Sequence, residues 1–160
     1  MSTLLVMNTQ TRFELLYETH VGSIYRYFTR RSAISDCEDL TSEVFTIAWR
    51  KIAEIPTEME LAWLYKTAWN VLANKRRKFV EIPIEELDIE GDDIADVIIE
   101  DESLKEAWLR LSIRDREVLR LTAWDGLAPD QLALVLNISV SGAGAALSRA
   151  RRKFEEEMVK

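Results

Sequence analysis

Side chains suited to binding a nucleic acid gather in one stretch of this chain, residues 61–79. Five of them recur at spacings of three and four, so a helix would place them on one face: Trp63, Lys66, Asn70, Asn74 and Arg77. The stretch closes with the basic run KRRK at 75–78. Cations bind phosphates and aromatic rings stack on unpaired bases, so the combination indicates single-stranded nucleic acid. A solvated helix end whose cations complement the helix dipole would also explain the basic run, but it explains the amide and aromatic face less well.

Carboxylates are concentrated just beyond, in residues 81–103, which hold eleven acidic residues and no lysine or arginine. The whole chain has 21 basic and 28 acidic residues and a net charge of −7, so outside this segment 21 basic residues face 17 acidic ones, which leaves +4. The negative total is therefore no argument against nucleic-acid binding. Like charges repel along such a segment, and its isoleucines follow no sustained helical or strand period. We expect an extended acidic linker between two compact blocks.

Residues for covalent or metal chemistry are scarce in the sequence. One cysteine, Cys37, and one histidine, His20, are too few for a disulfide framework, a Cys–His nucleophile pair or a His-rich metal site. The sequence has no nucleophile elbow, phosphate-binding glycine loop or catalytic carboxylate pair. We therefore expect no enzyme activity, metal, cofactor or small-molecule substrate. The sequence also has no signal-peptide pattern and no apolar run of membrane-spanning length, which predicts a cytoplasmic protein without a membrane partner.

The elements that must position these residues are all predicted to be helices. After a disordered N-terminus at 1–10, the first block spans 11–80, and its apolar spacing predicts helices at 11–31, 35–52 and 61–79. The first of these ends in Arg30-Arg31, where positive charge is favourable. Ser35 with Glu38 predicts a capping box for the second helix. Pro56 makes residues 53–60 a loop.

Phe45 and Trp49 lie one turn apart on the second predicted helix, away from its main apolar stripe. Large apolar groups off the stripe indicate a second contact surface. A bundle helix can also bury a wide face, so a third helix that covers both rings is an equally good interpretation.

The second block, residues 104–160, has the pattern of a helix-turn-helix. Helices are predicted at 102–111, 113–124 and 129–136, and a last helix follows Ser139, which is its predicted N-cap. Ser112 is a second predicted N-cap, and Asn137 suits the three-residue turn before the last helix. Ala128 stands where a capping serine is expected, a loss of about 1 kcal/mol. The buried stripe of the last helix is predicted to be Val140, Ala143, Leu147, Ala150 and Phe154. The fold class is therefore all-α, with two small helical domains joined by the linker, although a plain helical hairpin would give the same pattern in the second block.

The motifs ELLYETHVGSIYRYFTRR, SDCEDLTSEVFTIAW and AWLYKTAWNVLANKRRK occur in this order in the first block. They resemble region 2 of a bacterial RNA polymerase sigma factor of the extracytoplasmic-function (ECF) group. The resemblance implies that the second helix docks on the clamp helices of the polymerase through Asp39, Glu43, Phe45 and Trp49. It also implies that the −10 promoter element binds as single-stranded DNA, with a flipped base captured in the loop 55–60. The residues expected to bind the −10 element are Ile55, Pro56, Lys66, Asn70, Asn74, Arg76 and Arg77.

The motif LSIRDREVLRLTAWDGLAPDQLALVLNISVSGAGAALSRARRKF resembles sigma region 4, whose last helix reads the −35 element. The residues expected to contact this element are Ser141, Gly142, Ala145, Arg149, Arg152 and Lys153. The resemblance implies that region 4 spans 104–160, region 2 spans 11–80, and the acidic linker at 81–103 threads through the polymerase.

Two places depart from the family pattern. Many members have arginine where this chain has Trp69, which removes a phosphate contact or adds a stacking platform. Members usually carry lysine and arginine near the start of the recognition helix, where this chain has SGAGAA at 141–146. Such side chains offer little hydrogen bonding to base edges. We therefore predict that the second block contributes affinity, through phosphate contacts, more than sequence discrimination.

The partners that the resemblance implies are core RNA polymerase, through its β′ clamp and β flap, and promoter DNA, and it leaves room for an anti-sigma factor. The function would be that of an alternative sigma factor that directs promoter recognition and −10 melting. Two other functions stay open on the residues alone. One is a helix-turn-helix regulator that binds duplex operator DNA as a dimer without polymerase. The other is a sigma-like interaction module that has lost −35 reading, which the uncharged recognition helix favours.

Overall fold

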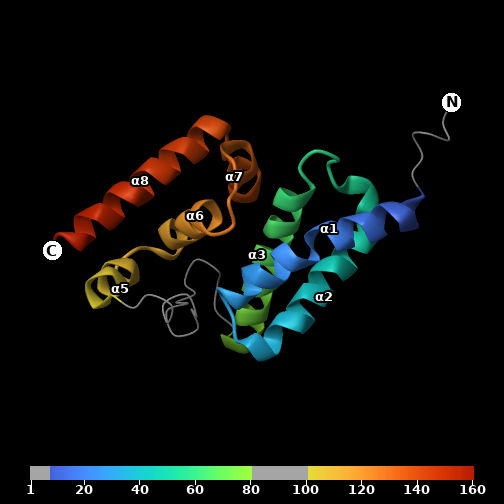
Figure 1. The fold of residues 1–160 in the computed structure, drawn as a ribbon, viewed down its shortest axis with the longest axis horizontal. Coiled ribbons are helices and arrows are strands. Elements are labelled where there is room, and N and C mark those ends of the chain that lie inside the picture. The colour runs from blue at the N-terminus through green and yellow to red at the C-terminus, as the bar shows by residue number, and fades with distance from the viewer. Residues whose placement is uncertain (1–7, 81–100) are drawn as a thin grey trace.

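The computed structural model describes residues 8–80 and 101–160, without the side chains of residues 78–80, and in these ranges every regular element is a helix. The elements are α1 (Thr9–Thr29), α2 (Ile34–Arg50), the short 3-10 helix η2 (Ile52–Glu54), α3 (Glu60–Val80), α5 (Glu102–Leu109), α6 (Ile113–Ala123), α7 (Pro129–Leu136) and α8 (Val140–Met158) (Figure 1). The all-α prediction is confirmed. The first seven residues of the expected disordered terminus, and residues 81–100 of the expected linker, lie outside the described part.

Short polar side chains cap four of the eight described helices, at Asn8, Asp101, Ser112 and Ser139. Ser112 Oγ accepts from the backbone N–H of Asp115, and Ser139 Oγ accepts from that of Gly142, so both predicted caps are confirmed. Ala128 has no capping oxygen, and the side chain of Gln131 instead accepts from the Ala128 N–H at 2.8 Å. Asn137 adopts the left-handed conformation expected for the turn, with φ 57°.

The predicted capping box at Ser35 and Glu38 is wrong. Helix α2 begins one residue earlier, at Ile34, with the extended residue Ala33 at its N-cap and no side-chain cap. The connection from α1 is short, so the helix closes at once with a tight bond from the Asp36 N–H to the Ala33 carbonyl at 2.9 Å. Ser35 therefore lies inside the first turn.

The N-terminal bundle consists of α1, α2 and α3, which pack on one another in all three pairs. Its core holds the apolar stripes that the sequence predicts, among them Leu16, Val44 and Leu64, which are all almost completely buried. Tyr17 is an exception, because its ring is 44% exposed at the edge of α1.

The C-terminal block is built around α8, which contacts α5, α6 and α7. Helices α7 and α8 meet at 93° across residues 137–139, which is the predicted helix-turn-helix geometry. Ala143 and Ala150 of the predicted stripe are buried, but Val140 is 53% exposed because it occupies the first turn. A ring cluster of Trp108, Trp124 and Phe154 ties α8 to α5 and to the end of α6.

The two blocks pack against each other through α3 and α7, and their buried apolar residues form one continuous core. Figure 1 shows the two blocks side by side, with α7 next to α3 and α8 on the far side of its block. Sequence patterns alone gave no information on this packing. The structure is therefore closed, with the two candidate binding blocks held together.

Candidate polymerase and nucleic-acid interface

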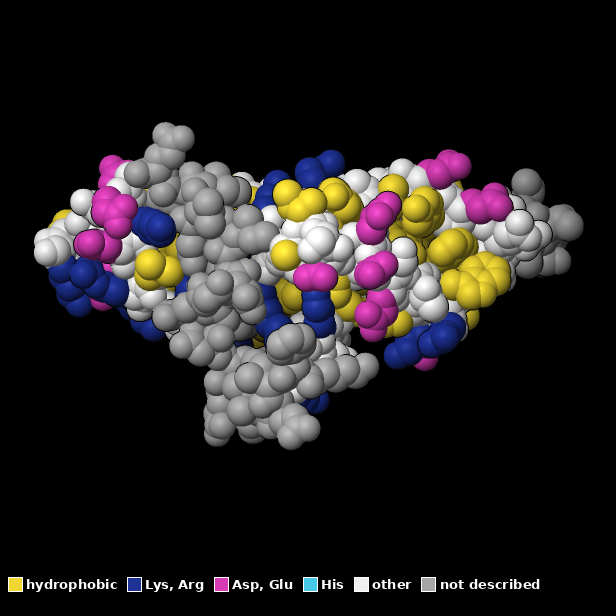
Figure 2. Space-filling view, turned by 90° about the horizontal axis from the view of Figure 1, so that it is seen from below, with side chains coloured by type: hydrophobic (Ala, Val, Ile, Leu, Met, Phe, Trp, Pro, Cys, Tyr) yellow, Lys and Arg dark blue, Asp and Glu magenta, His cyan; other side chains and the backbone are white. Residues whose placement is uncertain are grey.

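One face of α2 combines exposed carboxylates with an aromatic ring. Asp39 and Glu43 are exposed and one turn apart, and Trp49, further along the helix, is 46% exposed. Figure 2 looks at the molecule from the side on which α2 lies and shows hydrophobic and acidic side chains intermixed over the N-terminal bundle. Such a mixture on a bundle surface is suited to contact with another protein.

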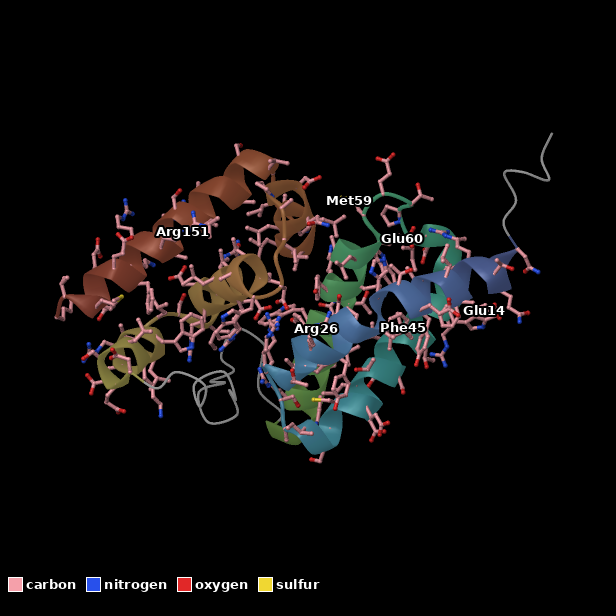
Figure 3. All side chains as sticks on the ribbon, viewed as in Figure 1. Glu14, Arg26, Phe45, Met59, Glu60 and Arg151 are labelled. Carbon is pink, nitrogen blue, oxygen red and sulfur yellow. The ribbon has the colours of Figure 1, made fainter. Side chains whose placement is uncertain are left out.

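Phe45 differs from the other three residues predicted to bind polymerase, because it is only 3% exposed. Its ring lies between α1 and α2 (Figure 3) and meets Tyr17 edge-on at 5.0 Å between centroids. Phe13 packs edge-on against Trp49 at 5.3 Å. Helix α1, and not a third helix, therefore covers Phe45 fully and Trp49 in part, and a contact surface at Trp49 stays a prediction.

The loop between α2 and α3 is held in place by an arginine that sequence reasoning missed. Arg12 donates from its two terminal nitrogens to the carbonyl of Ile52 at 2.7 Å and to that of Ile55 at 2.6 Å. Ile55 is 3% exposed, so its side chain belongs to the core, whereas Pro56 is exposed at the loop tip. Met59 and Glu60 follow where the loop enters α3 (Figure 3). No local pattern pointed to Arg12, because its partners are backbone groups 40 and 43 residues away.

Part of the predicted DNA-binding face of α3 is exposed on the surface. Asn70, Asn74 and Arg77 are exposed, and Lys66 is half-buried beside them on the same side of the helix. Lys75 is turned away to an ion pair with Asp36 of α2 at 2.7 Å. The amides and the terminal cation of the face therefore stay open to a ligand.

Trp69 and Arg76 lie on the neighbouring side of α3, which faces the C-terminal block. Both line a small cavity of about 10 Å³ together with Arg31 and, from α6, Ile113 and Glu117. Arg76 donates to the backbone carbonyl of Arg31 at 2.6 Å. In this closed structure Trp69 is half-buried at the junction of the blocks, and Arg76 supports the chain just after α1.

The two residues that follow α1 supply arginines to an ionic cluster at the junction of the blocks. We define the ionic cluster as Arg30 and Arg31 with Glu117 of α6 and Asp125, which follows α6. Arg31 donates to Glu117 at 3.0 Å and to Asp125 at 2.9 Å, and Arg30 donates to Asp125 at 2.6 Å. The side chains of Arg31, Glu117 and Asp125 are at most 6% exposed.

Tyr27 completes the surroundings of the ionic cluster. The Arg31 guanidinium stacks 3.7 Å above its ring, and its hydroxyl donates to Glu117 at 3.1 Å. Burial and the negative charge of Glu117 raise the pKa of Tyr27 well above its ordinary value, so the hydroxyl remains a donor. Burial opposes the charged form of Arg31, but Glu117, Tyr27 and Asp125 together outweigh burial and the pKa of Arg31 rises. Arg31 therefore stays charged at neutral pH.

The recognition helix α8 presents a small-residue face followed by cations. Ser141 and Ala145 are exposed and Gly142 is half-buried, while Arg149, Arg152 and Lys153 are exposed further along. Lys153 pairs with Asp115 at 3.3 Å and Arg152 with Glu156 at 3.9 Å, so these two cations are partly compensated. Arg151 also lies on α8 (Figure 3). The helix offers close backbone approach and phosphate-binding cations, with little hydrogen-bonding capacity for base edges.

Among the described residues, no three histidine, cysteine or acidic side chains converge in a way that could hold a metal ion. Across residues 8–80 and 101–160, no single helix has the length and apolar character to cross a membrane; α7 and α8 pass that criterion only as a pair, with the 93° bend between them.

The fold and these surfaces define a two-region helical protein with a helix-turn-helix, and comparison with known proteins agrees. Residues 16–79 match the family described as Sigma-70 region 2, and residues 101–154 match Sigma-70, region 4. Over 166 aligned residues the chain is 25% identical to the RNA polymerase sigma factor YlaC of Bacillus subtilis (strain 168). The alignment covers 96% of each chain. The chain therefore belongs to the sigma-70 family, as an alternative sigma factor of the ECF type.

Solved structures show the same fold. The structure of CnrH in complex with the cytosolic domain of CnrY covers 93% of this chain and 88% of its own, at 21% identity and a TM-score of 0.63. The co-crystal structure of the sigma factor RpoE with the anti-sigma factor NepR from Bartonella quintana covers 91% and 96%, at 20% identity and a TM-score of 0.64. Sigma factors are transcription initiation factors and not enzymes, which agrees with the expectation from the sequence.

Proposed function

We propose that this chain binds core RNA polymerase, brings it to a promoter and helps to open the −10 region. The observation that supports this most directly is the match of both sigma regions, in order, on a structure that exposes a mixed acidic and aromatic face on α2. Asp39, Glu43 and Trp49 would contact the polymerase clamp. Phe45 would act indirectly, because it supports the surface from inside.

The −10 element would bind as single-stranded DNA along α3 and the loop before it. Asn70, Asn74 and Arg77 are exposed and Lys66 lies beside them, so amides are available to bases and cations to phosphates. The loop tip at Pro56 is the place for a flipped base, and Arg12 keeps its backbone in position. Ile55 would shape the pocket from the core side.

The −35 element would be approached by the start of α8. Its small side chains let the helix backbone come close to the bases, and Arg149, Arg152 and Lys153 would neutralise phosphates. Lys153 and Arg152 would exchange their carboxylate partners for phosphates on binding. This arrangement favours affinity over base discrimination, in line with the prediction from the sequence.

A protein partner of the anti-sigma class belongs to the same proposal. Two of the similar solved structures are complexes, CnrH with the cytosolic domain of CnrY and RpoE with the anti-sigma factor NepR. The half-exposed Trp49 and the exposed Ile34 of α2 offer such a partner apolar contact.

The proposal is tested by co-elution of the full chain with core polymerase in gel filtration. The wild-type chain should co-elute, and the double variant Asp39→Lys, Glu43→Lys should not, because it reverses the charge of the α2 face. A matched control, Glu155→Lys with Glu156→Lys, reverses two exposed carboxylates of α8 and should still co-elute. Equal binding by both double variants would show that the α2 face is not the docking surface.

A further inference from the structure

In the ionic cluster, Arg30 and Arg31 come from the N-terminal bundle and both carboxylates from the C-terminal block, where the buried Arg120 of α6 also lies 3.8 Å from Glu117. A buried arginine and a partly exposed one, facing two buried carboxylates, contribute little net stability, because desolvation offsets most of the attraction. The apolar contact between α3 and α7 already holds the two blocks together. The cluster is better suited to an interface that must open.

The proposed function, on which this inference rests, requires such opening. The −10 and −35 elements are centred about 25 base pairs apart, which is roughly 85 Å at about 3.4 Å per base pair. A compact chain of 160 residues has a radius of gyration of about 15 Å, so the closed molecule falls well short of that span. Twenty residues connect Val80 to Asp101, and that many can reach about 65 Å by covalent geometry. The chain can therefore bind both elements only after the blocks separate.

Separation would uncover Arg30 and Arg31 at a particular place. The carbonyl of Arg31 accepts from Arg76, which belongs to the basic end of α3, and Trp69 lines the same small cavity. The two arginines are therefore continuous with the surface proposed to bind single-stranded DNA. In the open chain they would extend that surface by two cations and one aromatic ring.

The chemistry of the cluster matches that of a phosphate site. A guanidinium binds carboxylates and phosphates through the same planar fork of donors. Asp125 receives one hydrogen bond from each arginine through its two oxygens, the pattern in which a phosphate would be held. We propose that Arg30 and Arg31 form a phosphate-binding pair for the DNA strand, and that Glu117 and Asp125 occupy this pair in the closed chain. The carboxylates and the DNA backbone compete for the same two arginines, so DNA binding and block separation are coupled.

The test needs two variants that both open the chain but differ in what they leave behind. Glu117→Gln with Asp125→Asn removes the competing charges and keeps the arginines. Arg30→Gln with Arg31→Gln removes the arginines. Opening is measured as the distance between dyes on Ser42→Cys of α2 and Glu155→Cys of α8, in a Cys37→Ala background. Binding is measured on unlabelled full-length chain by the fluorescence anisotropy of a labelled single-stranded 20-mer DNA without polymerase.

Both double variants should show a longer distance between the dyes than the wild-type chain. Only the carboxylate variant should bind the 20-mer more tightly, by about tenfold, because the open chain, whose arginines can bind DNA, becomes more populated. A control with the same charge change away from the cluster, Glu102→Gln with Glu106→Gln on α5, should gain far less. The arginine variant should gain nothing, and its dependence on salt should be shallower than that of the carboxylate variant by about 0.7 per arginine.

An unchanged dye distance in the carboxylate variant would show that the ionic cluster does not hold the two blocks together. An equal gain in DNA affinity in the arginine variant would overturn the phosphate-binding pair, because opening alone would then explain it. If the carboxylate variant does not fold, judged by its thermal unfolding transition, Asp125→Asn alone carries the same comparison. The assay uses neither polymerase nor promoter, so its failure is distinguishable from a failure of the sigma-factor function, which transcription reports.

Discussion

At the scale of single residues, exposure separates side chains that a sequence pattern treats alike. Phe45 and Trp49 share a motif and a predicted role, yet one is buried and the other is half-exposed. Ile55 and Pro56 are neighbours in the loop, and only Pro56 reaches the surface. A buried ring supports a docking surface through packing, whereas an exposed ring contributes by direct contact. The two contributions are distinguishable by measuring stability and binding together.

The variants Phe45→Ala and Trp49→Ala should therefore fail in different ways. Removing the buried Phe45 ring should lower the free energy of unfolding by about 3–5 kcal/mol. Removing Trp49 should cost about 1 kcal/mol or less, since much of its ring is already in water. Denaturant unfolding gives the stability of each variant, and titration of labelled chain with core polymerase gives its binding. Trp49→Ala should weaken polymerase binding while the chain stays folded. Normal binding by this variant would show that the Trp49 ring contributes to packing and not to polymerase contact.

Arg149→Ala should weaken binding to most promoters alike. Arg149 is exposed beyond the small-residue start of α8, where it can reach a phosphate but is poorly placed to read a base. The measurement is transcription from a pool of promoters that differ only in the −35 element. A uniform loss is expected. A changed ranking of −35 sequences would show that Arg149 reads bases and would contradict the account of this helix.

At the scale of elements, local rules explain where helices begin and end, and distant contacts explain what holds them. Ser112, Ser139 and Asn137 were predictable because each acts on backbone groups within a few residues. The first residue of α2 was not predictable, because the short connection from α1 determines where this helix begins more than the capping side chain of Ser35 does. The role of Arg12 was equally out of reach, since its partners come from another part of the chain.

The two glycines of α8 should respond differently to alanine. A Cβ at Gly144 would meet no atom within 4 Å, so Gly144→Ala should raise the free energy of unfolding by about 0.5–1 kcal/mol through helix propensity. A Cβ at Gly142 would lie 3.0 Å from the capping Ser139 Oγ, so Gly142→Ala should gain less or lose stability. Thermal unfolding of the two variants compares them directly. Equal stabilisation would mean that the cap tolerates the methyl group.

Arg12→Ala should loosen the loop between α2 and α3. It removes the side-chain hydrogen bonds to the Ile52 and Ile55 carbonyls, so backbone amides at 52–59 should exchange with solvent faster. Arg50→Ala, which changes an exposed arginine at the end of α2, serves as the control and should leave this exchange unchanged. Unaltered protection in Arg12→Ala would show that the loop is held by its buried Ile55 alone.

At the scale of the whole molecule, the sequence predicts the parts better than their arrangement. Helix periodicity and the turn at Asn137 were enough for two all-helical blocks, and the motif resemblance was enough for their family. Block packing involves the α3–α7 contact and the bonds of Arg31 to Glu117 and Asp125, which lie 86 and 94 residues further along the chain. No local pattern signals such pairs: Arg30-Arg31 was interpreted as a favourable helix end, whereas both side chains reach across to the other block. The same packing explains why Trp69 and Arg76 lie at the junction in the closed chain.

The most direct test of the account is run-off transcription with purified core polymerase, with and without this chain, on a pool of promoter templates. We predict discrete transcripts that require the chain and disappear when the −10 sequence of the responsive template is changed. A chain that neither associates with core polymerase nor yields such transcripts, or that binds duplex DNA tightly and selectively without polymerase, would contradict the account.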